Sequence, residues 1–209
     1  MLSKNKKKLI LTSIVIILPV LIGLVLWNQL PDQVPTHWNA NGEIDGWSSK
    51  YFAVFIMPLI MLGVHILCMT VTSMDPKNKN ITSKPLNLVF WICPVMSIFA
   101  GCCTYAAALG IEVNMNTLAP AIIGIIFILT GNYLPKCQQN YTVGIKVPWT
   151  LHDENNWNAT HRFAGPVWMA GGVSLTILGI FGLELLFAAV LLIIAILPMI
   201  YSYLYYKKH

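Results

Sequence analysis

Residues 9–28 read LILTSIVIILPVLIGLVLWN, and this run without a charged side chain decides the fold. It follows the lysine-rich residues 4–8, an arrangement that is also typical of signal peptides. However, residues 27–30 (WNQL) contain no small-x-small cleavage site. Because about 20 apolar residues in a helix cross the hydrocarbon layer of a bilayer, we expect residues 9–28 to remain as a transmembrane anchor.

Further apolar runs predict more transmembrane helices of similar length. They cover residues 51–73, 86–110, 118–135, 163–182 and 185–205. The chain of 209 residues is 56% hydrophobic and 10% charged, with a mean hydropathy of +0.67, whereas soluble domains carry about a quarter charged residues. The sequence therefore predicts an all-α fold, a polytopic bundle of about six transmembrane helices embedded in the lipid bilayer.

The distribution of lysine and arginine predicts the orientation, because cytoplasmic loops carry the excess of these residues. With six spans and a cytoplasmic N-terminus, Lys50 alone falls outside. The remaining basic residues would lie in the cytoplasm: Lys4, Lys6, Lys7, Lys8, Lys77, Lys79, Lys84, Lys136, Lys146, Arg162, Lys207 and Lys208. We therefore attribute the net charge of +5 to topology, and we expect no direct contact with nucleic acid.

Two long polar loops organise the chain. Residues 1–73 are expected to form the first two helices with an outer loop at 29–50, and residues 86–209 a four-helix region with a cytoplasmic loop at 136–162. Loops of this length are usually functional or disordered, and their aromatic content argues against disorder. The five cysteines are odd in number and form no CxxC pair, so we expect reduced thiols.

The outer loop reads QLPDQVPTHWNANGEIDGWSSK. Asn41-Gly42 and Asp45-Gly46 are turn dipeptides, so an extended excursion with a hairpin-like return is expected. Two interpretations of its tryptophans remain open. They are either anchors at the depth of the lipid headgroups or part of a recognition surface for an extracellular ligand.

The cytoplasmic loop reads KCQQNYTVGIKVPWTLHDENNWNATHR. We expect Gly144 to permit a chain reversal and Thr150 to cap the helix that follows. On that helix Glu154, Trp157 and His161 would share one face. Just before the loop, Asn132 needs a polar partner from another helix or loop.

Chemical groups in this loop leave a second hypothesis open. His152, Asp153, Glu154 and His161 carry ligand-type side chains, so a membrane enzyme or small transporter acting on a lipid or peptide is the alternative function. No HExxH or comparable spacing is present, so we expect no catalytic residue, no metal and no cofactor. A structural membrane subunit is a third possibility.

Polar residues near the helices are expected to have structural roles. His65 is predicted to be a hydrogen-bonded interior histidine. Asp32, Asp75 and Glu184 are predicted to remain solvated at helix ends.

Both loops resemble known family signatures. Residues 30–47 are similar to the LPxxxPxHWNxxGxxDGW pattern of DUF1648, and residues 131–165 resemble the GN…N…GI+xPWTL…W…TH pattern of the SdpI family of bacterial immunity proteins. Many relatives carry Arg-Thr where this chain has Lys146-Val147, which keeps the charge but loses the fork geometry of arginine. The resemblance covers nearly the whole chain.

The resemblance implies a plasma-membrane protein that protects a Gram-positive bacterium against a secreted SdpC-type peptide toxin. It also implies that the protein draws a small cytoplasmic repressor, SdpR, to the membrane. The outward candidates for ligand recognition are Pro35, His37, Trp38, Asn39, Gly42, Asp45, Gly46 and Trp47. The candidates on the cytoplasmic side are Asn132, Asn140, Gly144, Lys146, Pro148, Trp149, Thr150, Trp157, His161 and Arg162.

Overall fold

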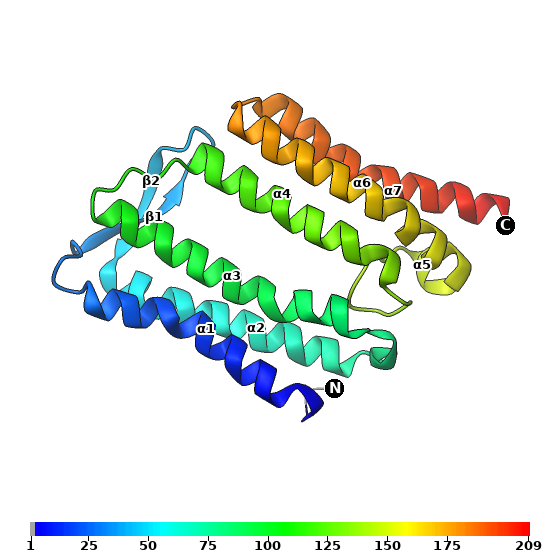
Figure 1. The fold of residues 1–209 in the computed structure, drawn as a ribbon, viewed down its shortest axis with the longest axis horizontal. Coiled ribbons are helices and arrows are strands. Elements are labelled where there is room, and N and C mark those ends of the chain that lie inside the picture. The colour runs from blue at the N-terminus through cyan, green and yellow to red at the C-terminus, as the bar shows by residue number, and fades with distance from the viewer. Residues whose placement is uncertain (1–2) are drawn as a thin grey trace. The chain divides into compact units, whose positions relative to one another are not determined.

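The computed structural model describes residues 3–209, in which six long apolar helices are joined by short loops and one β-hairpin (Figure 1). All six predicted spans are confirmed. The long helices are α1 (Lys6–Val25), α2 (Met57–Met74), α3 (Ser83–Ala108), α4 (Met115–Tyr133), α6 (Glu154–Ile180) and α7 (Glu184–Lys208). The shorter elements are η1 (Ser3–Asn5), β1 (Gln33–Trp38), β2 (Ile44–Ser49), η2 (Phe52–Ile56), η3 (Asn78–Asn80), η4 (Leu134–Lys136) and α5 (Pro148–His152).

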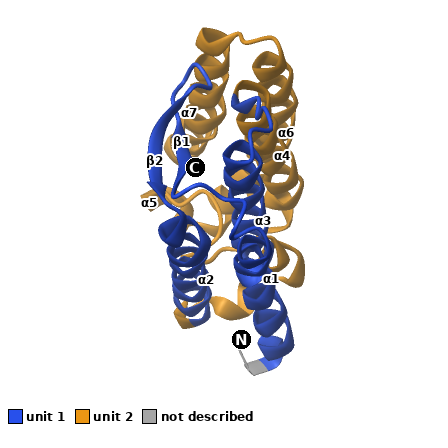
Figure 2. Cartoon of the chain, turned by 90° about the vertical axis from the view of Figure 1, so that its left-hand side faces the viewer, with its two compact units in different colours: residues 1–73, 89–115 blue, residues 74–88, 116–209 orange. Residues whose placement is uncertain are grey.

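The chain forms two compact units (Figure 2). Unit 1 contains the described residues through 73 together with 89–115, and so holds α1, the hairpin, α2 except its last residue, and most of α3. Unit 2 contains residues 74–88 and 116–209, and so holds the start of α3 and nearly all of α4 together with α5, α6 and α7.

Strands β1 and β2 form the antiparallel hairpin that the turn dipeptides predicted. Gln33 pairs with Ser49 at the base, and Trp38 pairs with Ile44 near the turn. The register shifts on both sides of His37, so the ladder is irregular there. Gly42 has a positive φ of 74°, which favours glycine in the turn between the strands.

The base of the hairpin packs into the core of unit 1. Leu30 and Val34, at the entry to the hairpin, are buried against Val54 of η2 and Tyr105 of α3. The Tyr105 hydroxyl donates a hydrogen bond to the carbonyl oxygen of Pro19 in α1 at 2.9 Å. These contacts fix the hairpin to the helices that carry it.

The segment η2 is a π-helical turn between the hairpin and α2. Pro58 has no N–H to donate to the carbonyl of Val54, so the α-helical ladder cannot continue through this point. Instead, the Met57 N–H bonds the Phe52 carbonyl. The wider turn lets the chain pass from β2 into α2 with only Lys50 and Tyr51 between strand and helix.

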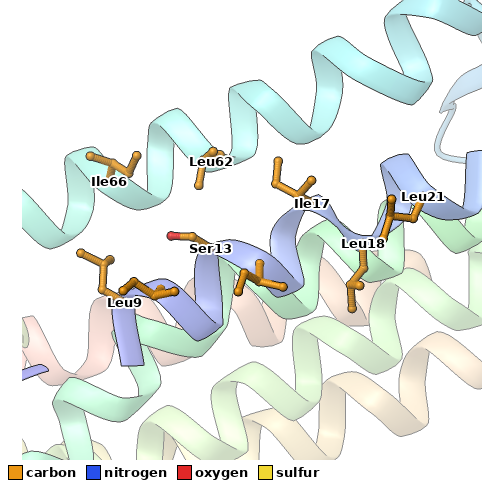
Figure 3. Close-up of a pocket in the computed structure, with 9 residues that line it drawn as sticks. Leu9, Ser13, Ile17, Leu18, Leu21, Leu62 and Ile66 are labelled. Carbon is orange, nitrogen blue, oxygen red and sulfur yellow. The ribbon is translucent and has the colours of Figure 1, made fainter. Parts of the chain in front are cut away.

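An apolar groove of about 560 Å³ runs between α1 and α2 (Figure 3). Leu18 and Leu21 of α1 and Leu62 and Ile66 of α2 line it, and Ser13 is its polar member. Many other apolar side chains of the long helices are exposed as well, Leu185 of α7 at 85%. Such a surface is stable only when apolar material covers it, which the hydrocarbon of a bilayer provides.

Helices α4 and α6 of unit 2 pack so closely that glycine is required at the contact. A Cβ on Gly124 would lie 2.5 Å from the carbonyl oxygen of Gly172, and one on Gly131 would lie 2.8 Å from that of Gly165. From the first pair to the second, the residue number rises along α4 and falls along α6, so the two helices are antiparallel. Small residues allow this approach where lipid supplies no hydrophobic driving force between helices.

Polar and aromatic contacts join α6 to α7. The Trp168 indole donates to the carbonyl of Ile194 at 2.9 Å, and Phe163 stacks on Tyr201 with ring centroids 4.3 Å apart. The buried Asn156 donates to the carbonyl of Ser202 at 3.0 Å and accepts from its hydroxyl at 2.6 Å. The two helices therefore form an antiparallel pair, as the short connection between them predicted.

Candidate functional site

Asn39 organises the tip of the hairpin. Its side-chain oxygen accepts hydrogen bonds from the backbone N–H groups of Asn41 and Glu43 at 2.9 and 3.0 Å. Its amide donates to the Glu43 carboxylate at 3.1 Å. Asparagine supplies an acceptor and a donor on one short side chain, which is why this residue type can hold a turn from within.

Other hairpin candidates also serve the backbone. Pro35 is buried, and a Cβ on Gly46 would lie 2.6 Å from the Cβ of His37 in the facing strand. Trp38 is half-buried. These residues shape the hairpin, and their role in ligand recognition stays a prediction.

Three candidate side chains remain at the hairpin surface. The His37 Nδ1 lies 2.5 Å from Asp45 Oδ1, and these side chains are 69% and 44% exposed. Trp47 is 57% exposed. Trp38 and Trp47, which flank the turn dipeptides, therefore differ, because only Trp47 offers a large apolar surface.

Aromatic residues hold the base of the hairpin. Lys50 lies over the Trp27 ring at 5.1 Å and pairs with Asp32 at 3.0 Å. Tyr51 contacts the same Trp27 ring edge to face, with centroids 4.8 Å apart. Asp32 is exposed, as expected for a solvated acid.

Asn140 plays the corresponding role in the loop between α4 and α6. It is buried, and its amide donates to the carbonyls of Gln138 and Val143 at 2.8 and 2.9 Å. Its oxygen accepts from the backbone N–H groups of Thr142 and Val143. One side chain thus satisfies four backbone polar groups of this turn.

His161 holds the next stretch of the loop from α6. Its Nδ1 donates to the carbonyl of Trp157 at 2.8 Å, because a carbonyl only accepts, and its Nε2 therefore accepts the Ile145 N–H at 2.9 Å. The rings of Trp157 and His161 stack with centroids 4.1 Å apart. Gly144, at φ 132°, passes directly over both rings.

Trp157 ties α6 to the other end of the loop. Its indole N–H donates to the carbonyl of Cys137 at 2.7 Å. Burial raises the pKa of the Cys137 thiol to about 11. The expectation that Trp157 and His161 share a face is confirmed, whereas Glu154 is exposed.

Thr150 does not cap the following helix, so that prediction was wrong. It is the third residue of α5, where its hydroxyl donates to the carbonyls of Ile145 and Val147 and accepts the Val147 N–H at 3.0 Å. Asp153 caps α6 instead, accepting from the N–H groups of Asn155 and Asn156. The difference arises because α5 ends at His152 and the chain restarts as a new helix.

Asp75 is the residue that sequence reasoning missed. It was expected to be solvated at a helix end, and that prediction was wrong because it is only 3% exposed. Its carboxylate accepts hydrogen bonds from the Tyr141 N–H, the Thr142 hydroxyl and the Lys77 N–H, each at 2.8 Å. No local signal marks it, since two of these partners lie 66 and 67 residues along the chain.

Several of the candidates that were predicted for the cytoplasmic side are exposed. Lys146 reaches back to the carbonyl of Thr142 at 3.0 Å, and Pro148 and Arg162 face outward. Asn132 is exposed as well, and its expected polar partner from another helix or loop stays a prediction. Trp149 packs against the rings of Tyr203 and Tyr206 in α7.

The groups invoked for an enzyme are engaged separately. Asp153 caps α6, both ring nitrogens of His161 are hydrogen-bonded, and His152 is exposed. Within residues 3–209, no group of three His, Cys, Asp or Glu side chains lies close enough to hold a metal ion. The predicted interior histidine is confirmed, since His65 is buried with Nε2 3.0 Å from the Thr12 hydroxyl.

Comparisons with known proteins cover both segments. Residues 14–62 match the domain of unknown function DUF1648, and residues 136–202 match the SdpI/YfhL protein family. The chain is 30% identical over 206 residues to the immunity protein SdpI of Bacillus subtilis (strain 168), covering 97% of each protein. No solved structure matches. The chain, a multi-pass bacterial membrane protein, belongs to the SdpI family.

Proposed function

We propose that this chain is an immunity protein and receptor that protects its host cell against a secreted antimicrobial peptide of the SdpC type. The observation that carries the proposal is the similarity to an immunity protein over 97% of both chains. Because that similarity includes the hairpin and the segment between η4 and α6, here called the 137–153 loop, it concerns the segments that carry most of the candidate residues and not the apolar helices alone.

The hairpin is the proposed recognition site on the extracellular side. Trp47 supplies an exposed aromatic surface, and tryptophan is among the side chains that contribute most of the binding energy at interfaces. The paired His37 and Asp45 supply a polar edge beside it. The hydrogen bonds of Asn39 at the tip and the contact between Trp27 and Tyr51 at the base keep this surface rigid, so little conformational freedom is lost on binding.

The 137–153 loop is the proposed cytoplasmic site. The exposed Lys146 of this loop and the exposed Arg162 that follows it in α6 suit an acidic protein surface. We infer that a repressor of the SdpR type binds there once toxin is engaged. For toxin on one side to alter binding on the other, it must prefer one of two arrangements of the protein.

Survival measures the protective function. Cells of a toxin-sensitive strain would carry this gene or an empty vector and be exposed to purified SdpC-type peptide. We expect survival with the gene and killing without it. Equal killing would remove the immunity proposal, provided that membrane fractions contain the protein.

The signalling function needs a separate measurement. A tagged SdpR-type repressor would be followed between soluble and membrane fractions with and without the peptide. We expect it to move to the membrane only when both this protein and the peptide are present. A repressor that stays soluble in cells that survive would contradict capture and leave immunity standing.

A further inference from the structure

The buried carboxylate of Asp75 is the centre of a contact between two segments far apart in sequence. It receives hydrogen bonds from the Tyr141 N–H and the Thr142 hydroxyl, and also from the N–H of its own neighbour Lys77. With only 3% of its surface exposed, water competes little for these donors. Asp75 is therefore one of the side chains that fix the position of the 139–142 turn.

The residues that follow Asp75 hold the same turn. The Lys77 ammonium donates to the side-chain oxygen of Gln139, and the Asn80 amide donates to the Gln139 carbonyl at 2.8 Å. The Gln139 amide in turn donates to the carbonyls of Thr150 and Leu151 in α5. A single short segment, residues 75–80, thus holds the turn through side chains, and movement of that segment would remove these bonds together.

This segment is covalently continuous with α2. Asp75 directly follows Met74, the last residue of α2. At the other end, η2 leads directly into α2, and only Lys50 and Tyr51 separate η2 from the end of β2 at Ser49. Hydrogen-bonded helices move as stiff elements, so a displacement at the hairpin end of α2 is carried to its other end.

We propose that Asp75 is a positioning residue that holds the 139–142 turn in place, and that a ligand on the hairpin shifts α2 and so pulls the Asp75 carboxylate away from this turn. Withdrawal of the carboxylate would also free the Lys77 ammonium from Gln139. Lys146 contacts the same turn through the carbonyl of Thr142, so two lysines would become available there. The opened surface is basic and suits an acidic patch on a cytoplasmic protein. This inference rests on the proposed function, because it names how the same two sites communicate.

Hydrogen exchange of the full-length protein in lipid nanodiscs tests the contact without any toxin. We expect Asp75→Ala to speed exchange in peptides from 139–147 by about tenfold, because the lost bonds involve a charged acceptor. Thr142→Val, which removes one donor, should give a smaller increase. Asp153→Ala is the matched control, since that carboxylate also accepts two backbone N–H groups, but only within its own helix.

The result separates a positioning role from general stability. Faster exchange confined to 139–147, with unchanged protection in α6 and α7, supports the proposal. Unchanged exchange in that loop overturns it, as does an equal increase throughout unit 2. If Asp75→Ala does not fold, Thr142→Val decides by the same criterion.

Purified SdpC-type peptide then tests the coupling. Added to the wild type, it should raise exchange in 139–147 toward the Asp75→Ala level, and it should have little further effect on that variant. If the peptide leaves loop exchange unchanged while the gene still protects cells, the coupling is overturned and the proposed function stands. If the gene gives no protection but Asp75→Ala still loosens the loop, the immunity proposal fails and the contact stands.

Discussion

Gly144 lies where the loop crosses the stacked rings of Trp157 and His161. Its φ of 132° is strained for any residue with a side chain, and a Cβ would lie 2.5 Å from His161 Nε2. We expect Gly144→Ala to lower stability by about 3 kcal/mol, measured by thermal unfolding in detergent. Gly182→Ala is the control, since Gly182 also has a positive φ of 65° but open space around it. Equal losses in both variants would contradict a role for the ring contact.

Cys137 offers a test of loop closure through its chemistry. Burial raises the pKa of this thiol to about 11, so at pH 8 on the order of one molecule in a thousand carries the reactive thiolate. We expect Cys137 to resist a water-soluble maleimide in the native protein and to react once the protein is denatured. An exposed reference thiol, introduced as His152→Cys, should react quickly. Rapid native labelling of Cys137 would show that the loop opens readily.

Trp47 is the hairpin residue whose removal should affect binding without affecting the fold. Because its side chain is 57% exposed, Trp47→Ala should leave thermal stability nearly unchanged. Loss of an aromatic anchor typically costs about 2 kcal/mol of binding energy. We therefore expect the toxin concentration that kills the cells to fall by about tenfold or more. Trp91→Ala, which removes an exposed tryptophan from α3, controls for general effects on the membrane protein.

At this scale, the sequence predicts which segments matter better than what each residue does. The family signatures locate the hairpin and the loop, yet Asn39, Asn140 and Thr150 turn out to hold their own backbone. Asp75 was predicted to be solvated because it lies at the end of a helix. Its partners come from a distant segment, and a single sequence carries no signal for such pairs.

The contact between α4 and α6 gives a prediction for whole elements. A Cβ on Gly172 would lie 2.5 Å from the carbonyl oxygen of Gly124, and two backbones cannot separate without disturbing the rest of the pair. We expect Gly172→Ala to lower the thermal stability of the protein by about 3 kcal/mol. Gly63→Ala in α2 is the matched control, since no atom lies within 4 Å of its Cβ position and alanine favours helix. A similar loss in both variants would mean that helix propensity, and not packing, is responsible.

The existence of the long helices was predictable because lipid requires about 20 apolar residues per span, whatever their order. The residues at which these helices begin and end were less predictable. The run at 163–182 belongs to a helix that already begins at Glu154, since Asp153 caps it and Trp157 and His161 of its first turns hydrogen-bond to the loop. The π-helical turn at η2 escaped prediction as well, because it depends on how Pro58 meets the packing of unit 1.

For the molecule as a whole, the proposed function requires the hairpin and the 137–153 loop to face opposite sides of the membrane. From the excess of lysine and arginine we expect the hairpin to lie outside and the loop to lie in the cytoplasm. Single cysteines at Asn41 in the hairpin turn and His152 in the loop, both exposed, report on each side. An impermeant maleimide should label Asn41→Cys in intact cells and His152→Cys only after permeabilisation, while the unaltered chain controls for its native thiols. If both variants react in intact cells, or neither does, a receptor that carries a signal across the bilayer is excluded, because ligand and partner would meet the protein on one side.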